Sequence, residues 1–228
     1  NKYIYRFSGP YEPLFKDIQL FDSTDYSLHE GIFCQRSYAG SVYNSGGSVS
    51  QTNVNVDWSN ISNMLEKDFI GSSLIVSDGG AGVGLTTGYS DRLVLSDFNI
   101  EIPEDSKIDS INLYIYKKGG WTRTFSITTG GYSFYDQEVK IVLDGIESSD
   151  LSKTTHYNPY WYVDKYTLNN ISSAITNNNF DIEVYFSVLF NYYITGGKIR
   201  PAESNIDSVE IQICYTMPRV TKGEYYFN

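Results

Sequence analysis

The residue types that carry out enzyme chemistry are scarce and scattered in this sequence. Its two histidines, His29 and His156, lie far apart, and neither belongs to a His-Glu-x-x-His motif or has a second ligand at metal spacing. There is no Gly-x-Ser-x-Gly motif, and neither cysteine has a histidine partner that the sequence identifies. We therefore predict that the chain has no catalytic residues and is not an enzyme.

Carboxylates offer one further route to catalysis. Glu101, Glu104 and Asp105 surround a single turn, whereas a glycosidase needs two carboxyl groups that face each other across a cleft. A glycan-cleaving enzyme is the third interpretation that we carry, and solvated turn carboxylates are the simpler one. The stretch Gly79–Gly84 does not have the spacing of a nucleotide-binding loop, and we expect a turn between strands there.

Loop carboxylates could also hold a metal ion. Asp78, Asp136 and Asp144 are oxygen ligands of the kind that calcium prefers, but their spacing is unlike that of an EF-hand. We expect no cofactor, and calcium is the ion that these residues would suit.

Aromatic residues are the best candidates for recognition. The loop HYNPYWYVDKY (156–166) contains five of them, and the stretch GGWTRTF (119–125) adds Trp121. Exposed Tyr and Trp can stack on sugar rings or anchor a protein interface, but aromatic residues in a loop can also cap the end of a core. The candidate ligand-binding residues are Tyr157, Tyr160, Trp161, Tyr162, Tyr166 and Trp121.

The segments that must position these residues look like β-strands. Two similar phrases, IDSINLYIY (108–116) and IDSVEIQIC (206–214), both place an apolar residue at every second position. This period predicts strands with one buried face, with the first Ile of each phrase tucked under the rim and its Asp and Ser turned to the rim. The inward residues would be Ile111, Leu113 and Ile115 in the first phrase, and Val209, Ile211 and Ile213 in the second.

The rest of the chain reads as further short strands with turn residues between them. Short helices are predicted near residues 59–66 and 168–175. We therefore predict an all-β fold, an antiparallel β-sandwich that is jelly-roll-like, with one or two short helices. The sandwich would span 56–217, after an extended N-terminal arm or edge segment at 1–55 and before a tail at 218–228.

The net charge argues against one class of partner, and the spacing of the cysteines bears on how they pair. The net charge is −10, from 17 Lys and Arg against 27 Asp and Glu, which argues against nucleic-acid binding. No apolar run approaches the roughly 20 residues of a membrane helix. Cys34 and Cys214 have no motif spacing, so we expect unpaired thiols, with a bridge between them as the alternative.

Several pieces of the sequence follow one another in a recognisable order: DWSN (57–60), KDF (67–69), LVLSDFNIEIPEDSKIDSINLYI (93–115), DQEVKIVLDG (136–145), YWYVDKYTLNNISSAITNNNFDIEVYF (160–186) and NIDSVEIQICY (205–215). In this order the pieces resemble the β-sandwich virion proteins of tailed bacteriophages. The sequence departs from the pattern at Ser110 and Asp181, where the family often has Gly, and residues 1–55 lie outside the resemblance.

The resemblance implies a structural protein of the virion, such as a head fibre, tail, baseplate or capsid decoration component. Such a protein would act by assembly, as a homo-oligomer in contact with other virion proteins. Attachment to a glycan of the host surface through the aromatic loop would be a second function. The alternative is a secreted, extracellular carbohydrate-binding β-sandwich module.

Overall fold

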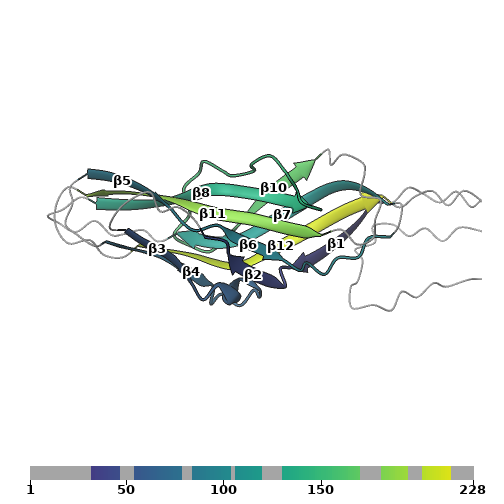
Figure 1. The fold of residues 1–228 in the computed structure, drawn as a ribbon, viewed down its shortest axis with the longest axis horizontal. Coiled ribbons are helices and arrows are strands. Elements are labelled where there is room, and N and C mark those ends of the chain that lie inside the picture. Colours follow the sequence, from purple (N-terminus) through teal and green to yellow (C-terminus); the bar gives the residue numbers. More distant parts are fainter. Residues whose placement is uncertain are drawn as a thin grey trace, which may run out of the picture.

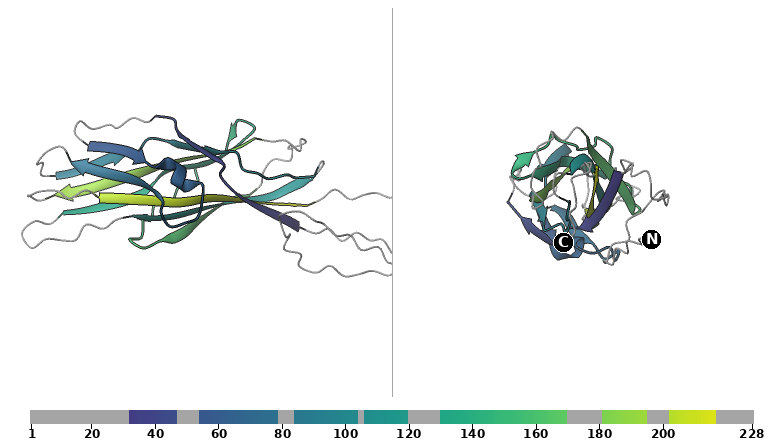
Figure 2. Two further views of the ribbon diagram at one scale, coloured as in Figure 1. Left: turned by 90° about the horizontal axis from the view of Figure 1, so that it is seen from below. Right: turned by 90° about the vertical axis from the view of Figure 1, so that its right-hand side faces the viewer.

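The computed structural model of the chain describes residues 32–46, 54–78, 84–103, 106–119, 130–169, 181–194 and 202–216. These residues form two six-stranded antiparallel sheets, which we call sheet A and sheet B (Figure 1). Seen down the long axis, the strands of both sheets surround one core (Figure 2). The prediction of an all-β antiparallel sandwich is confirmed.

The bounds of the strands follow their order in each sheet. Sheet A consists of β10 (Tyr162–Asn169), β7 (Lys107–Gly119), β12 (Ala202–Thr216), β4 (Ser72–Asp78) and β3 (Val54–Ser59), with β1 (Ile32–Tyr38) also paired to β12. Sheet B consists of β2 (Ser41–Asn44), β6 (Leu93–Ser96), β11 (Ile182–Ile194), β8 (Gly130–Leu143) and β9 (Ile146–Glu147), with β5 (Gly84–Tyr89) also paired to β11.

The chain crosses repeatedly from one sheet to the other. Strands β6, β8 and β11 belong to sheet B, whereas strands β7, β10 and β12 belong to sheet A. Elements that are close in sequence therefore face each other across the core. This connectivity brings side chains of β7, β8 and β10 together at one place between the sheets.

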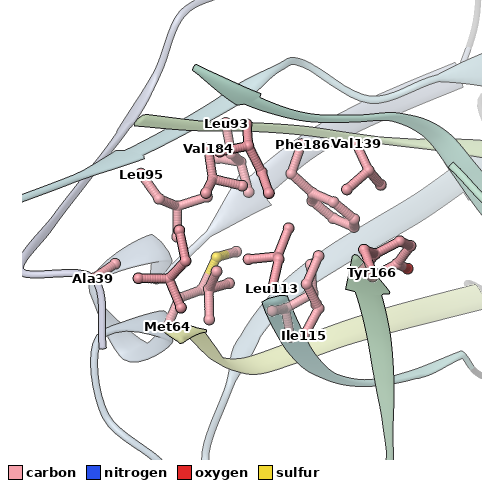
Figure 3. Close-up of a cluster of buried hydrophobic side chains, with 14 of the residues drawn as sticks. Ala39, Met64, Leu93, Leu95, Leu113, Ile115, Val139, Tyr166, Val184 and Phe186 are labelled. Carbon is pink, nitrogen blue, oxygen red and sulfur yellow. The ribbon is translucent and has the colours of Figure 1, made fainter. Parts of the chain in front are cut away.

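The core is built from the apolar rows that the period of two predicts. Leu113 and Ile115 of sheet A point toward Val139, Val184 and Phe186 of sheet B (Figure 3). Full burial of such a side chain stabilises the fold by roughly 1.5–3 kcal/mol. The six predicted inward residues, Ile111, Leu113, Ile115, Val209, Ile211 and Ile213, all have an exposed fraction of 0%.

The two similar phrases are neighbours in sheet A. Ile111 of β7 lies opposite Ile213 of β12, in antiparallel register. The register shifts at the Asp of each phrase, so that Asp109 and Asp207 are both extra residues of a β-bulge. The prediction that the Asp and Ser of both phrases turn to the rim is wrong for the second phrase, because Asp207 and Ser208 are buried.

Helical structure is limited to one short turn in the described residues. A 3-10 helix spans Ile61–Met64 after Asn60, whose side chain makes no capping hydrogen bond, and it buries Met64. The predicted second helix is wrong at Leu168, which lies in β10, and residues 170–180 fall outside the described residues. No helix among the described residues is long and apolar enough to cross a membrane.

The described part of the predicted N-terminal segment belongs to the edges of both sheets. Within 1–55, β1 pairs with β12 and β2 pairs with β6. Residues 1–31 and the tail 218–228 lie outside the described residues.

The two cysteines form a disulfide, so the expectation of unpaired thiols is wrong. Cys34 on β1 and Cys214 on β12 are register partners, and their Cα atoms are 4.1 Å apart. Antiparallel pairing of distant segments brings them together, and their spacing along the sequence carries no sign of it.

Candidate functional site

The structure divides the predicted aromatic residues between the core and the surface. Tyr157 and Tyr166 each have an exposed fraction of 2% and belong to the core of the sandwich. Tyr160 has an exposed fraction of 79%, and Trp161, next in the chain, is half-buried. The aromatic loop therefore contributes to two different sites, one outside sheet A and one between the sheets.

The remaining two candidates contribute less. Tyr162 is half-buried at the start of β10, where burial and the negative charges of Asp164 and Asp136 raise the pKa of its hydroxyl. Trp121 lies outside the described residues.

The site on the surface is a group of three rings, Phe69, Tyr116 and Trp161, which we call the aromatic surface. Trp161 stacks on Tyr116 with ring centroids 5.4 Å apart and an interplanar angle of 6°. Phe69 meets Tyr116 edge-on, with centroids 5.5 Å apart. Offset stacking and edge-to-face contacts are favourable arrangements for aromatic pairs, so the group is held in a defined geometry.

Strand β7 and two loops position these rings. Tyr116 points outward from β7 because its neighbours Ile115 and Lys117 point inward. Gly71, with φ of +61°, brings the loop before β4 against Trp161, where a Cβ atom at Gly71 would come within 3.0 Å of the ring atom Cη2. A side chain at position 71 would push the tryptophan away from Tyr116.

Two lysines border the aromatic surface. Lys67 Nζ lies 4.6 Å from the centroid of the Tyr116 ring, and Lys118 Nζ lies 4.5 Å from that of Trp161. Neither lysine has a carboxylate partner in the described part of the chain. In a protein with a net charge of −10, this face therefore carries positive charge next to its rings.

A row of polar groups continues along the same face of sheet A. The Tyr114 hydroxyl donates a hydrogen bond to Gln212 Oε1 at 3.0 Å, and Asn112 Nδ2 donates to the same oxygen at 3.2 Å. Thr167 Oγ1 donates to Asn112 Oδ1 at 2.9 Å, and the Arg36 guanidinium lies 4.9 Å from the Tyr114 ring centroid. The face thus combines apolar ring area with ordered donors and acceptors.

The site between the sheets is centred on Lys117, whose side chain has an exposed fraction of 0%. Its Nζ lies 2.6 Å from Asp136 Oδ1, 3.0 Å from Asp164 Oδ2 and 2.7 Å from the Tyr166 hydroxyl. Three strands from both sheets supply these groups: β7, β8 and β10. A buried ammonium group thus has two carboxylate partners.

The Asp136 carboxylate receives hydrogen bonds on both oxygens. The Tyr157 hydroxyl donates to Oδ1 at 2.8 Å, and the Tyr166 hydroxyl donates to Oδ2 at 2.7 Å. The backbone N–H of Lys153 also donates to Oδ2, at 3.0 Å. The Lys153 Nζ donates to Asp164 Oδ1 at 2.7 Å, so every member of the cluster is hydrogen-bonded.

The pKa values of the cluster reflect its burial. Burial, followed by the negative charge of Asp136, raises the pKa of Tyr157 and Tyr166, so both phenols stay protonated donors. Burial also pushes the pKa of Asp164 upward, but the positive charges of Lys117 and Lys153 outweigh it and leave that pKa below its ordinary value.

Sequence reasoning missed this cluster, although one signal points to it. Lys117 lies two residues after Ile115, so it continues the inward row of β7 at a position where a charged residue is out of place. No comparable sequence signal marks its partner Asp136. A β-bulge at Gln137 lets Asp136 and Val139 both face inward despite their odd separation, and such a bulge cannot be read from the local pattern.

The carboxylates proposed for calcium are not gathered at one loop. Asp136 faces Lys117 inside the sandwich, Asp144 lies in the exposed turn between β8 and β9, and Asp78 ends β4. Among the residues that the structure describes, no three His, Cys, Asp or Glu side chains form a group that could hold a metal ion. Asp136 and Asp164 converge on Lys117 rather than on a site open to a metal ion.

Comparisons with known proteins add little to this geometry. No family model matches the chain, and no curated protein matches it. Among solved structures, the chain is similar to a xylan-binding module, CBM15, with 11% sequence identity, a TM-score of 0.34, and coverage of 80% of this chain and 97% of that chain. A similarity at this level carries no argument about function.

Proposed function

We propose that this chain is a non-catalytic recognition module that binds a glycan across the aromatic surface of sheet A. The observation that supports this function is the stacked pair of Trp161 and Tyr116 at the surface, with the exposed Phe69 against it. Apolar faces of sugar rings pack on such aromatic groups. The hydroxyl groups of the sugar then find donors and acceptors in the polar row beside them.

The charges of the face favour an acidic glycan. Lys67 and Lys118 border the rings without carboxylate partners in the described part of the chain. A uronic acid or sulfated sugar that stacks on Trp161 would bring its negative charge close to both ammonium groups. We therefore propose that acidic glycans bind more tightly than neutral ones, and that salt weakens their binding.

The disulfide supports a location outside the reducing cytosol. A bond between Cys34 and Cys214 persists in an oxidising environment, such as the extracellular space or the surface of a virion. Both locations would expose the aromatic surface to glycans.

The first experiment is a glycan array, followed by calorimetric titration of the best acidic and neutral oligosaccharides. Trp161→Ala should weaken binding roughly tenfold or more, because it removes the stacking ring from the centre of the site. Tyr43→Ala is the matched control, since Tyr43 is an aromatic residue with an exposed fraction of 49% on β2 of the opposite sheet. Circular dichroism shows whether each variant is folded.

Lysine variants then test the preference for acidic ligands. Replacing Lys67 and Lys118 by Met should remove the difference in affinity between acidic and neutral glycans while the stacking contribution stays. The proposal is wrong if no glycan binds, or if Trp161→Ala and Tyr43→Ala bind equally well.

Assembly into a virion is a second candidate function. The resemblance to virion β-sandwiches stays a prediction, and one observation is in its favour: Ile32 and Tyr38 of the edge strand β1 have exposed fractions of 68% and 41%. We propose that a second chain docks along this strand. Light scattering of the full chain and of an Ile32→Lys, Tyr38→Lys variant tests this, and a monomer in both cases would contradict it.

A further inference from the structure

We propose that Lys117 and Asp136 join through a covalent amide bond that cross-links sheet A to sheet B. The reacting groups are already in contact, because Lys117 Nζ lies 2.6 Å from Asp136 Oδ1. Their side chains have exposed fractions of 0% and 1%, so bulk water does not compete for either group.

Aromatic rings surround the reacting amine. The centroids of the Tyr157, Tyr166 and Phe186 rings lie 4.1, 5.4 and 5.9 Å from Lys117 Nζ. These rings keep bulk water away from the amine and hold it against Asp136. An amine is a nucleophile only in its neutral form, so the ammonium group of Lys117 must lose a proton before it attacks.

A second carboxylate is in place to move the proton. Asp164 Oδ2 lies 3.0 Å from Lys117 Nζ and can accept a proton from its ammonium group. The Lys153 ammonium holds the other oxygen of Asp164 at 2.7 Å, which fixes the orientation of this carboxylate.

The hydroxyl groups of two tyrosines are aimed at the position where negative charge develops. Tyr157 and Tyr166 donate to Oδ1 and Oδ2 of Asp136, and the Lys153 backbone N–H supports Oδ2. When the amine attacks, charge grows on these oxygens, and donors already in place stabilise it without reorganisation.

The reaction balances without any further reagent. Lys117 Nζ gives a proton to Asp164, and its lone pair forms a bond to Cγ of Asp136. One C–O bond of the tetrahedral intermediate then breaks, and that oxygen leaves as water with two protons that began on the ammonium group. An ammonium and a carboxylate thus give one amide and one water, with no oxidant or other co-reactant. Fixed proximity of the two groups replaces the activation that amide formation needs in solution.

The intact mass of the purified chain tests the proposal directly. After reduction of the disulfide, the mass should be lower than that of the sequence by one water. A tryptic digest should contain a branched peptide in which Lys117 and Asp136 are joined and Lys117 is not cleaved. Because wild-type protein gives this answer, the test does not depend on whether any variant folds.

Variants assign the roles. Lys117→Arg keeps the positive charge but removes the amine, and it should restore the full mass. Asp164→Asn removes the proton acceptor, and it should slow or abolish the loss of water in a chain that circular dichroism shows to be folded. Lys140→Arg is the matched control, since Lys140 lies on β8 outside the cluster, where it pairs with Glu147 at 2.7 Å, and the variant should leave the loss of water intact.

Two results would contradict the amide bond between Lys117 and Asp136. Full sequence mass in folded wild-type protein, after long incubation at neutral and mildly acidic pH, would overturn the proposal. So would a loss of water that persists in Lys117→Arg or that maps to another pair of residues.

Discussion

Cys34 on β1 lies directly opposite Cys214 on β12, and a disulfide joins the two residues across 180 positions of sequence. The bond ties an edge strand to a strand that also pairs with β7 and β4 in sheet A. We predict that replacing both cysteines by Ser lowers the free energy of unfolding by about 2–4 kcal/mol, because the unfolded chain loses a long-range constraint. Urea denaturation with and without reductant measures this. The double variant should be insensitive to reductant, and a wild-type protein that is equally insensitive would contradict the prediction.

Asp207 gives a prediction about pH. Its carboxylate oxygens are buried without a hydrogen-bond partner in the described part of the chain, and burial raises the pKa of Asp207. The backbone amides of Phe69 and Asp68 lower this pKa in part, although neither reaches hydrogen-bond geometry. The folded chain therefore binds this proton more tightly than the unfolded chain does. The contribution of Asp207 to stability is greatest below the unfolded pKa of about 4, and it falls as pH rises through the higher folded value.

Asp207→Asn should accordingly raise the free energy of unfolding at pH 7 by about 1 kcal/mol, with little gain at pH 4. Thermal melts at the two pH values measure the difference. Asp109→Asn is the matched control, because Asp109 occupies the equivalent bulge but is half-buried and accepts a hydrogen bond from Thr216 Oγ1 at 2.6 Å. Equal effects of the two variants at pH 7 would count against this explanation.

Gly119 sets the position of Tyr157. A Cβ atom at Gly119 would come within 2.6 Å of the Tyr157 Cβ, so Gly119→Ala must displace the tyrosine and weaken its hydrogen bond to Asp136. We predict a loss of about 1–3 kcal/mol in the free energy of unfolding, as for other overpacked core positions. Thr154→Ala, in the exposed part of the same loop, should change stability by less than about 0.5 kcal/mol. Urea denaturation measures the free energy of unfolding of both variants. Similar values would contradict the prediction, because they would show that Tyr157 moves aside without cost.

Arg92 and Glu138 form a bidentate ion pair on sheet B. Arg92 Nε and Nη2 donate to the two carboxylate oxygens at 2.7 and 2.8 Å, and the guanidinium lies 4.9 Å from the Tyr185 ring centroid. Arg92→Lys keeps the charge but loses this geometry, and it should cost about 0.5–1 kcal/mol. Glu147→Gln is the control: it removes the exposed partner of Lys140 and should change the free energy of unfolding little. A double-mutant cycle on Arg92 and Glu138 would refute the prediction if it gave no coupling energy.

The strands and their inward faces could be predicted because the information is local. Leu113 and Ile211 are buried wherever their strands lie in the sandwich, since alternation within a few residues fixes which face meets the core. The sequence could not show that these two residues are register partners in neighbouring strands. Strand order depends on contacts between distant segments, and no local pattern encodes it.

The aromatic surface and the Lys117 cluster were harder to predict, because both depend on strand boundaries and on contacts between distant segments. In the aromatic loop, Trp161 stays at the surface because it precedes β10. Tyr166 is buried because it lies within β10 at a position that faces the core. A shift of one residue in the start of the strand would exchange inward and outward residues. The Lys117 cluster was missed because its members come from three strands and from the loop before β10. The bulge that turns Asp136 inward leaves no mark in composition.

The position of the disulfide has a mechanical consequence. Ile32 begins β1 and Thr216 ends β12, and the two residues are register partners. The start of β1 and the end of β12 lie at the same end of the molecule (Figure 1). A pull on the chain through Ile32 and Thr216 would peel these strands apart one hydrogen bond at a time, which is the weakest way to load a sheet. The covalent bond between Cys34 and Cys214 lies just inside that opening. Tension would therefore run through two sulfur atoms, and the sandwich behind them would carry none of it.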